Sequence, residues 1–144
     1  GERYLHGHII DFIRKLRRDN SQLYILGDGW QAKSGLHAAN LAEGLLLTMQ
    51  HHDLDESVCE VYNFGGDTLL PVYASARLIA EEVMGLTPKY EFSGRPNGGW
   101  VGDNPSLVLD WSKAAALGWK PTMTVPNGIR LTAEWLLGSE CSYL

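Results

Sequence analysis

The chain has 144 residues, of which 44% are hydrophobic and 20% are charged, and its formal net charge is −5. This length suits one domain that buries a core without disulfides, and we expect no metal site. A negative net charge argues against nucleic-acid binding, and no apolar run approaches the roughly 20 residues that cross a bilayer. Because residues 1–8 lack the apolar core of a signal peptide, the default expectation is a cytoplasmic location.

Helices and short strands alternate in the first third of the chain. A stripe of apolar side chains at helical spacing predicts a first helix over residues 9–18. Residues 23–26 and 31–34 are predicted to be two short strands on either side of a glycine-rich turn. A second helix is expected to begin at Asn40, which has the spacing of a reciprocal N-cap with Glu43, and to pack through its leucines.

The rest of the chain continues this mixture of elements. Residues 58–64 alternate and are rich in β-branched side chains, which predicts a strand with Cys59 buried in it. The Gly- and Pro-rich segment 93–105 is expected to be a long loop, a feature that is more often functional than incidental. The other expected elements are a helix closed by Gly85, strands at 89–92 and 107–109, a helix at 112–117 and a last helix from Thr124.

These elements predict the fold class. Four to five helices mixed with short strands indicate a small two-layer α+β domain over residues 1–138, followed by a flexible tail at 139–144.

Four motifs follow one another along the chain. They are Ile25-Leu26-Gly27-Asp28-Gly29-x-Gln31-x-Lys33 with its continuation to Glu43, Tyr62-Asn63-Phe64-Gly65-Gly66, Arg95-Pro96 through Gly102-Asp103, and Asp110-x-Ser112-Lys113-Ala114-x-x-Leu117-Gly118-Trp119-x-Pro121. Their content and order resemble the C-terminal half of the extended short-chain dehydrogenases. This family contains NAD-dependent sugar-nucleotide epimerases and dehydratases of the UDP-glucose 4-epimerase type. The resemblance covers about the whole chain.

The resemblance implies an isolated domain that binds a nucleoside-diphosphate sugar (NDP-sugar). Lys33 and Arg95 match family positions that contact the phosphates or ribose of the nucleotide, and Asp103 matches the acidic residue of the family's R-P-G-D motif. The alternative is that Lys33 and Arg95 are solvated surface charges and that Asp103 forms an Asx turn.

Two features of a complete enzyme of this family are absent from the sequence. Gly27-Asp28-Gly29 does not continue into the glycine fingerprint of a dinucleotide site. None of the five lysines has a tyrosine four residues before it, so the family's Tyr-x-x-x-Lys pair is missing. We therefore expect no cofactor in this chain, although the complete family enzyme uses NAD, and no catalysis by this chain alone.

A second class of function stays open, because the chain departs from the family pattern at several aromatic positions. Large aromatic side chains surrounded by small ones are typical of protein-binding patches. Such a patch, adapted by evolution or engineering, would comprise Trp30, Ala32, Ala38, Ala39, Tyr73 and Trp111. The alternative is ordinary core packing of these aromatic rings. The expected partners are therefore an NDP-sugar, another protein or a second copy, but neither nucleic acid nor membrane.

Overall fold

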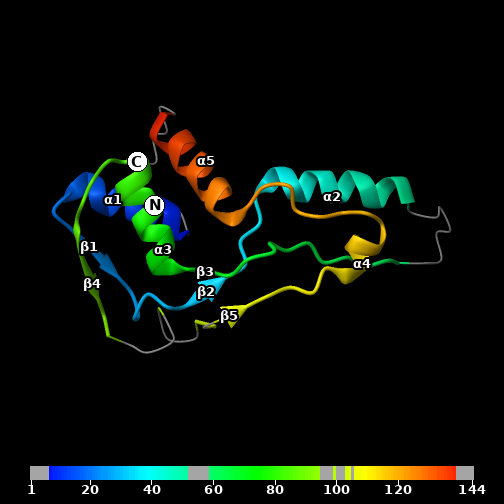
Figure 1. Cartoon of the computed structure of the whole chain (residues 1–144), viewed down its shortest axis with the longest axis horizontal. Coiled ribbons are helices and arrows are strands. Elements are labelled where there is room, and N and C mark those ends of the chain that lie inside the picture. The colour runs from blue at the N-terminus through cyan, green and yellow to red at the C-terminus, as the bar shows by residue number, and fades with distance from the viewer. Residues whose placement is uncertain (1–6, 52–58, 95–98, 100–102, 105, 139–144) are drawn as a thin grey trace, which may run out of the picture.

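The computed structural model describes residues 7–51, 59–94, 99, 103–104 and 106–138 (Figure 1). Its helices are α1 (His8–Arg18), α2 (Ala38–His51), α3 (Val72–Arg77), the π-helix η1 (Leu78–Val83), α4 (Ser112–Ala116) and α5 (Val125–Gly138). Its strands are β1 (Gln22–Ile25), β2 (Ala32–Lys33), β3 (Leu70–Pro71), β4 (Lys89–Phe92) and β5 (Ser106–Leu107). The predicted small α+β domain is confirmed. None of the described helices is long and apolar enough to span a membrane.

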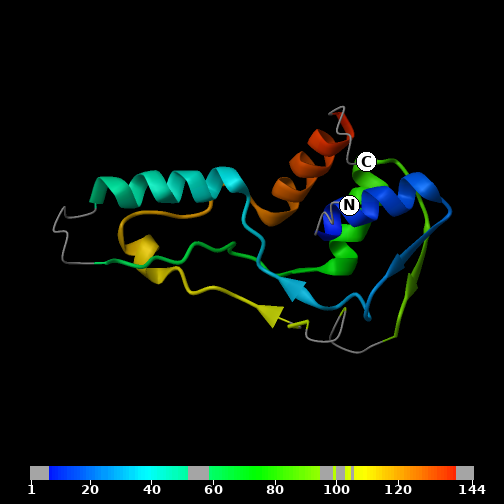
Figure 2. The ribbon, with the colours of Figure 1, turned by 180° about the vertical axis from the view of Figure 1, so that it is seen from behind.

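The elements divide into two regions, which we call the body and the arm (Figures 1 and 2). The body contains α1, α3, η1 and α5 beside the pair β1 and β4. The arm contains α2 and α4, together with the two long connections at 59–69 and 108–111. In both views α2 extends away from the body and runs alongside these connections.

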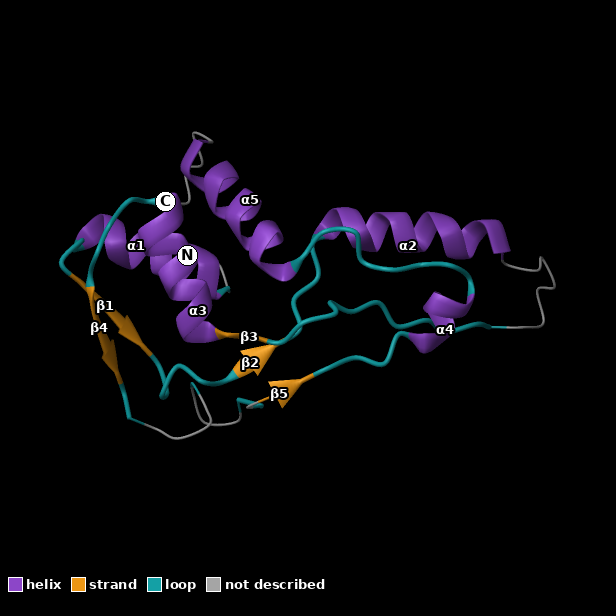
Figure 3. Ribbon diagram, in the orientation of Figure 1, coloured by secondary structure: helices purple, strands orange, loops and turns teal. Residues whose placement is uncertain are grey.

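Two small sheets connect the elements, as the strands in Figure 3 show. In the body, β1 and β4 run parallel with Ile25 opposite Phe92. Where the arm joins the body, β2 pairs antiparallel with β3 and parallel with β5, so that Ala32 lies opposite both Pro71 and Ser106. The central position of β2 places the residues after β1 next to those before β5.

The hydrophobic core lies in the body. The inner stripe of α1 supplies Phe12, Ile13 and Leu16, which are at most 3% exposed. Alternate residues of β1, Leu23 and Ile25, are buried against them because successive side chains of a strand point to opposite faces. The remaining core side chains come from α3, η1 and α5, and they are Ala76, Leu78, Ile79, Ala80, Val125, Ile129, Ala133 and Leu136.

The start of α2 differs from the prediction. The helix begins before Asn40, and that side chain is 1% exposed inside the structure, so the predicted N-cap is wrong. Asn40 Oδ1 accepts hydrogen bonds from the backbone N–H groups of Thr122 and Met123, each at 3.2 Å, and Nδ2 donates to the Met123 carbonyl oxygen at 3.0 Å. The side chain of His37 fills the capping role, because its Nδ1 accepts the Ala39 N–H at 3.2 Å.

The packing face of α2 also differs from the prediction. The helix buries only Asn40 and Gly44, while its apolar side chains point outward, among them Leu46 at 61% exposure and Met49 at 73%. Gly44 is required at its position because a Cβ there would overlap the Phe64 ring and lie 2.9 Å from Trp119 Nε1. The expectation that α2 packs through its leucines is therefore wrong within the described part of the chain.

The segment after α2 is not a strand. Residues 59–64 carry the strand-like sequence, but they pair with no strand among the described residues, and Cys59 is exposed rather than buried. β-propensity measures how well side chains fit a pleated surface, and here no neighbouring strand supplies that surface. The predicted strand at 58–64 and the buried thiol are thus wrong in the part of the segment that is described.

We predict that Asn40→Ala lowers the free energy of unfolding by about 2 kcal/mol, because it removes a buried amide whose hydrogen bonds pair the partly buried backbone groups at 122–123. Urea denaturation followed by circular dichroism measures this change. Asn63→Ala is the matched control, since its exposed amide makes a hydrogen bond to the Asp110 carbonyl oxygen, and we expect it to cost less than about 1 kcal/mol. Equal losses in the two variants would contradict the role assigned to Asn40.

Candidate functional site

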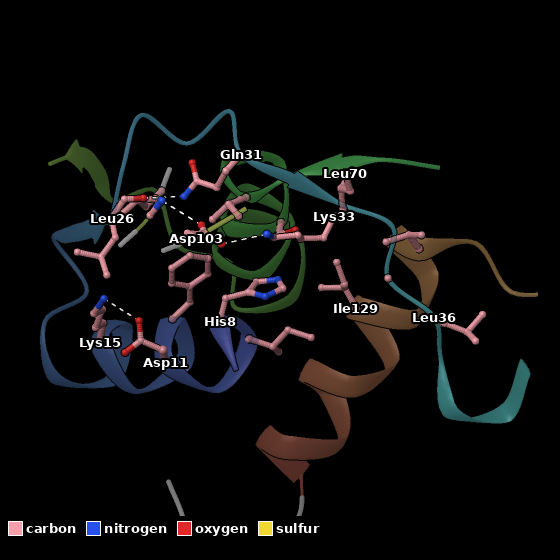
Figure 4. A pocket seen from close by; sticks show the side chains of 18 of the residues that line it. His8, Asp11, Lys15, Leu26, Gln31, Lys33, Leu36, Leu70, Asp103 and Ile129 are labelled. Atoms are coloured by element: carbon pink, nitrogen blue, oxygen red, sulfur yellow. Dashed lines mark hydrogen bonds and ion pairs between the residues drawn. The ribbon is translucent and has the colours of Figure 1, made fainter. Parts of the chain in front are cut away.

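A cavity of about 370 Å³ opens in the body, between α1, the end of β1, β2 and the start of α5 (Figure 4). Apolar side chains form most of its wall, with Phe12 from α1, Leu26 after β1 and Ile129 from α5. A few polar side chains reach it from separate elements. A mostly apolar cavity of this size with a few convergent polar groups is typical of small-molecule sites, which span roughly 300–1,000 Å³.

An ion pair closes one side of the cavity. Lys33 Nζ lies 2.9 Å from Asp103 Oδ1, although the two residues are 70 positions apart in the sequence. The pairing of β2 with β5 explains this contact, because it brings the residues just before β5 alongside Lys33. The dashed line between these two side chains marks the pair in Figure 4.

Two further contacts hold the ion pair. Lys33 Nζ also donates to the Asn104 carbonyl oxygen, and the Gly99 N–H donates to Asp103 Oδ2 at 3.0 Å. Burial raises the pKa of the Asp103 carboxyl, but the hydrogen bonds from Lys33 and Gly99 outweigh burial and hold this pKa below its ordinary value. The carboxylate is therefore charged at neutral pH.

Gln31 lies deep beside this pair. It is 4% exposed, and its Nε2 donates to the Leu26 carbonyl oxygen at 2.7 Å (Figure 4). Its Oε1 is buried and has no hydrogen-bond partner among the residues that the structure describes. Gln31 stands in the family motif of the sequence, and this place in the motif was the available signal for a role that no prediction assigned to it.

The α1 side of the cavity carries polar residues that the sequence analysis missed. Lys15 Nζ lies 2.7 Å from Asp11 Oδ2 and donates to the Tyr24 carbonyl oxygen at 3.2 Å. The His8 ring lies at the rim of the cavity, edge-on to Phe12 with ring centroids 5.8 Å apart. Partial loss of water lowers the pKa of His8, and the Asp11 carboxylate opposes this shift. The helical spacing of His8, Asp11 and Lys15 predicts that these side chains share one face of α1, but it does not predict that this face borders a cavity.

Of the predicted substrate-binding residues, the structure brings Lys33 and Asp103 together, and Arg95 lies outside the described residues. The predicted protein-binding residues do not gather in one place. Trp30 is 70% exposed in the turn after β1, next to Gly29, whose carbonyl oxygen accepts the Tyr73 N–H at 3.0 Å.

The other members of the predicted patch are more enclosed. The half-buried Tyr73 ring packs edge-on against Tyr90 at 5.2 Å between centroids. Trp111 is half-buried in the arm, where its ring lies 5.3 Å from the Trp119 ring. Ala32 is partly buried, and Ala38 and Ala39 are exposed. The role of these residues in protein binding stays a prediction.

Comparison with curated proteins identifies relatives that are longer than this chain. The chain is 28% identical over 116 residues to probable GDP-L-fucose synthase 1 from Oryza sativa subsp. japonica, covering 80% of this chain and 32% of the relative. It is 30% identical over 126 residues to dTDP-glucose 4,6-dehydratase 1 from Escherichia coli (strain K12), covering 84% of this chain and 34% of the relative. The chain thus spans about a third of the length of these relatives.

Solved structures show the same relationship. A crystal structure of UDP-galactose 4-epimerase matches with a TM-score of 0.73 and 33% identity, over 95% of this chain and 42% of that chain. MoeE5 in complex with UDP-glucuronic acid and NAD matches with a TM-score of 0.71 and 25% identity, over 91% of this chain and 41% of that chain. No family profile matches the chain. The family resemblance of the motifs is nevertheless confirmed, and this chain is related to a part of the larger sugar-nucleotide epimerases and dehydratases.

Proposed function

We propose that the chain binds an NDP-sugar in the body cavity. The observation that carries this proposal is the convergence of Lys33 and Asp103 on one wall of that cavity. These are the two residues matched to the family's ligand contacts that the structure describes. Their meeting across 70 positions supports a site rather than two unrelated surface charges.

The chemistry of the cavity suits the parts of such a ligand. The Lys33 ammonium is a compact positive charge that attracts a phosphate oxygen, and the Asp103 carboxylate accepts hydrogen bonds from hydroxyl groups. The apolar wall around Phe12 and Leu26 can cover a flat ring, such as a base, on entry of the ligand. The similar protein MoeE5 was solved in complex with UDP-glucuronic acid and NAD, which supports an NDP-sugar as ligand.

The described residues do not fit the NAD of the complete family enzymes. A dinucleotide site places the pyrophosphate at a helix N-terminus directly after a strand and a glycine turn. Here β1 and the turn Gly27-Asp28-Gly29 lead into the strand β2 instead of a helix. We therefore assign ligand binding, and no hydride transfer, to this chain.

A second proposed role is attachment of a partner to the arm. The outer face of α2 exposes Leu41, Leu45, Leu46 and Met49, which share one side of the helix. Beside α2, the segment 59–64 has the sequence of a strand but no pairing partner within the described residues. The matched segment is about a third of each relative, so the unmatched part of each relative is about twice as long as the matched part. We propose that a dinucleotide-binding domain covers the α2 face.

For the ligand role, we predict that UDP-glucose or dTDP-glucose raises the melting temperature by about 5 °C or more at roughly 100 times its Kd. Lys33→Met should abolish the shift because it removes the cation, and the family match predicts the same for Arg95→Ala. A thermal-shift titration measures both effects.

Lys120→Met is the control for the ligand test, since Lys120 is an exposed lysine that does not line the cavity. It should keep the full shift. If neither sugar nucleotide shifts the melting temperature at millimolar concentration, the ligand role is refuted.

For the partner role, we predict that Leu45→Glu combined with Leu46→Glu weakens binding of a dinucleotide-binding domain at least about 30-fold, because charges would be buried at the contact. That domain can be prepared from the E. coli dehydratase by removing the segment that this chain matches. Light scattering and calorimetry measure complex formation.

Leu131→Glu is the matched control for the partner test, because Leu131 is an exposed leucine on α5, away from the arm. It should bind like the unaltered chain. Unchanged binding by the α2 variant, or an equal loss with Leu131→Glu, would refute the assigned surface.

A further inference from the structure

The Lys33 ammonium, which is the cation of the proposed ligand site, already donates hydrogen bonds to acceptor groups of the chain itself. The Lys33 ammonium has three N–H donors. One faces Asp103 Oδ1 at 2.9 Å, and another faces the Asn104 carbonyl oxygen. A phosphate that pairs with the Lys33 ammonium must therefore displace the Asp103 carboxylate, which already pairs with it.

The Asp103 carboxylate is held in this position from two sides. Its Oδ2 accepts the Gly99 N–H at 3.0 Å, while Oδ1 contacts Lys33. The Asp103 side chain is only 15% exposed, against 39% for Lys33. Partial burial strengthens the interaction between the charges relative to a pair in open water. The contact thus differs from the exposed surface pairs that contribute little to stability.

The neighbouring charges do not offset this carboxylate. The other described carboxylate and ammonium on the cavity wall, Asp11 and Lys15, also pair with each other, at 2.7 Å. The formal charges of the described aspartates and lysines on the wall therefore sum to zero. An entering diphosphate meets no unpaired lysine among them.

We propose that Asp103 acts as an internal anion that competes with the ligand's phosphate for Lys33 and so limits the affinity of the site for anionic ligands. This inference rests on the proposed NDP-sugar function. Ligand entry exchanges one anionic partner of Lys33 for another. The site then discriminates by charge: a dianionic group displaces the carboxylate more readily than a neutral sugar does.

The test is a double-mutant cycle between Asp103→Asn and Lys33→Met. The asparagine is nearly the same shape, and its amide oxygen can still accept the Gly99 N–H. Isothermal titration measures Kd for inorganic pyrophosphate, UDP and uncharged uridine on the full chain and the three variants. We expect Asp103→Asn to tighten pyrophosphate and UDP binding about tenfold, because the Lys33 ammonium then has no anionic partner that the phosphate must displace.

Two controls show whether the gain comes from release of Lys33. Uridine affinity should not change, and in the Lys33→Met background, where pyrophosphate and UDP binding is lost, Asp103→Asn should not restore it. Asp11→Asn removes a carboxylate from the same cavity but leaves the Lys33 pair intact, so its gain should be smaller. An equal gain with Asp11→Asn would overturn the proposal, since it would indicate a general field effect.

Weaker UDP binding in Asp103→Asn would overturn the competition and identify Asp103 as a direct ligand contact. Unchanged UDP binding would overturn the competition alone, and in both cases the proposed function stands. Absence of UDP and UDP-glucose binding in both the unaltered chain and Asp103→Asn would refute the proposed function and this inference together. Circular dichroism checks folding of each variant. Asp103→Ser supplies the same comparison if the asparagine variant does not fold.

Discussion

The pairing of β2 on both of its edges is the constraint on which the rest of the structure depends. This strand has only two residues, yet it hydrogen-bonds to β3 on one side and to β5 on the other. Three distant parts of the chain therefore meet at Lys33. The backbones also approach closely just beyond, because a Cβ on Gly66 would overlap the Gly35 carbonyl oxygen. A side chain at Gly66 would push apart the segments that link the body to the arm.

The sequence predicted those elements whose pattern depends on local spacing. The apolar stripe at 9–18 corresponds to α1, and the strands predicted at 23–26 and 89–92 correspond to β1 and β4. Gly85, with φ of 66°, follows the third predicted helix as its backbone preference indicates. The family motifs singled out Lys33 and Asp103, which the structure brings into contact, and their role in ligand binding stays a prediction. Their contact required β2–β5 pairing, which no local pattern of two residues can specify.

The errors of prediction share one physical cause. Apolar side chains at helical spacing indicate a face that avoids water, but they do not tell whether the chain itself supplies the cover. On α2, Leu41, Leu45 and Leu46 are exposed, and the buried positions belong to Gly44 and to Asn40, which was predicted to be a cap. Asn40 was misassigned because its hydrogen bonds reach residues 122–123, far along the sequence.

The body and the arm differ in how they are stabilised, and this difference separates the two proposed roles. The main core draws none of its buried side chains from α2 or α4. The arm is instead held by the Phe64 and Trp119 rings, 4.9 Å apart and edge-on, and by the hydrogen bonds of Asn40. Because the cavity belongs to the body and the exposed leucines belong to the arm, substitutions in the two places share no described partner. Their effects on ligand binding and on partner binding should therefore be independent, since residues without common contacts contribute nearly additively.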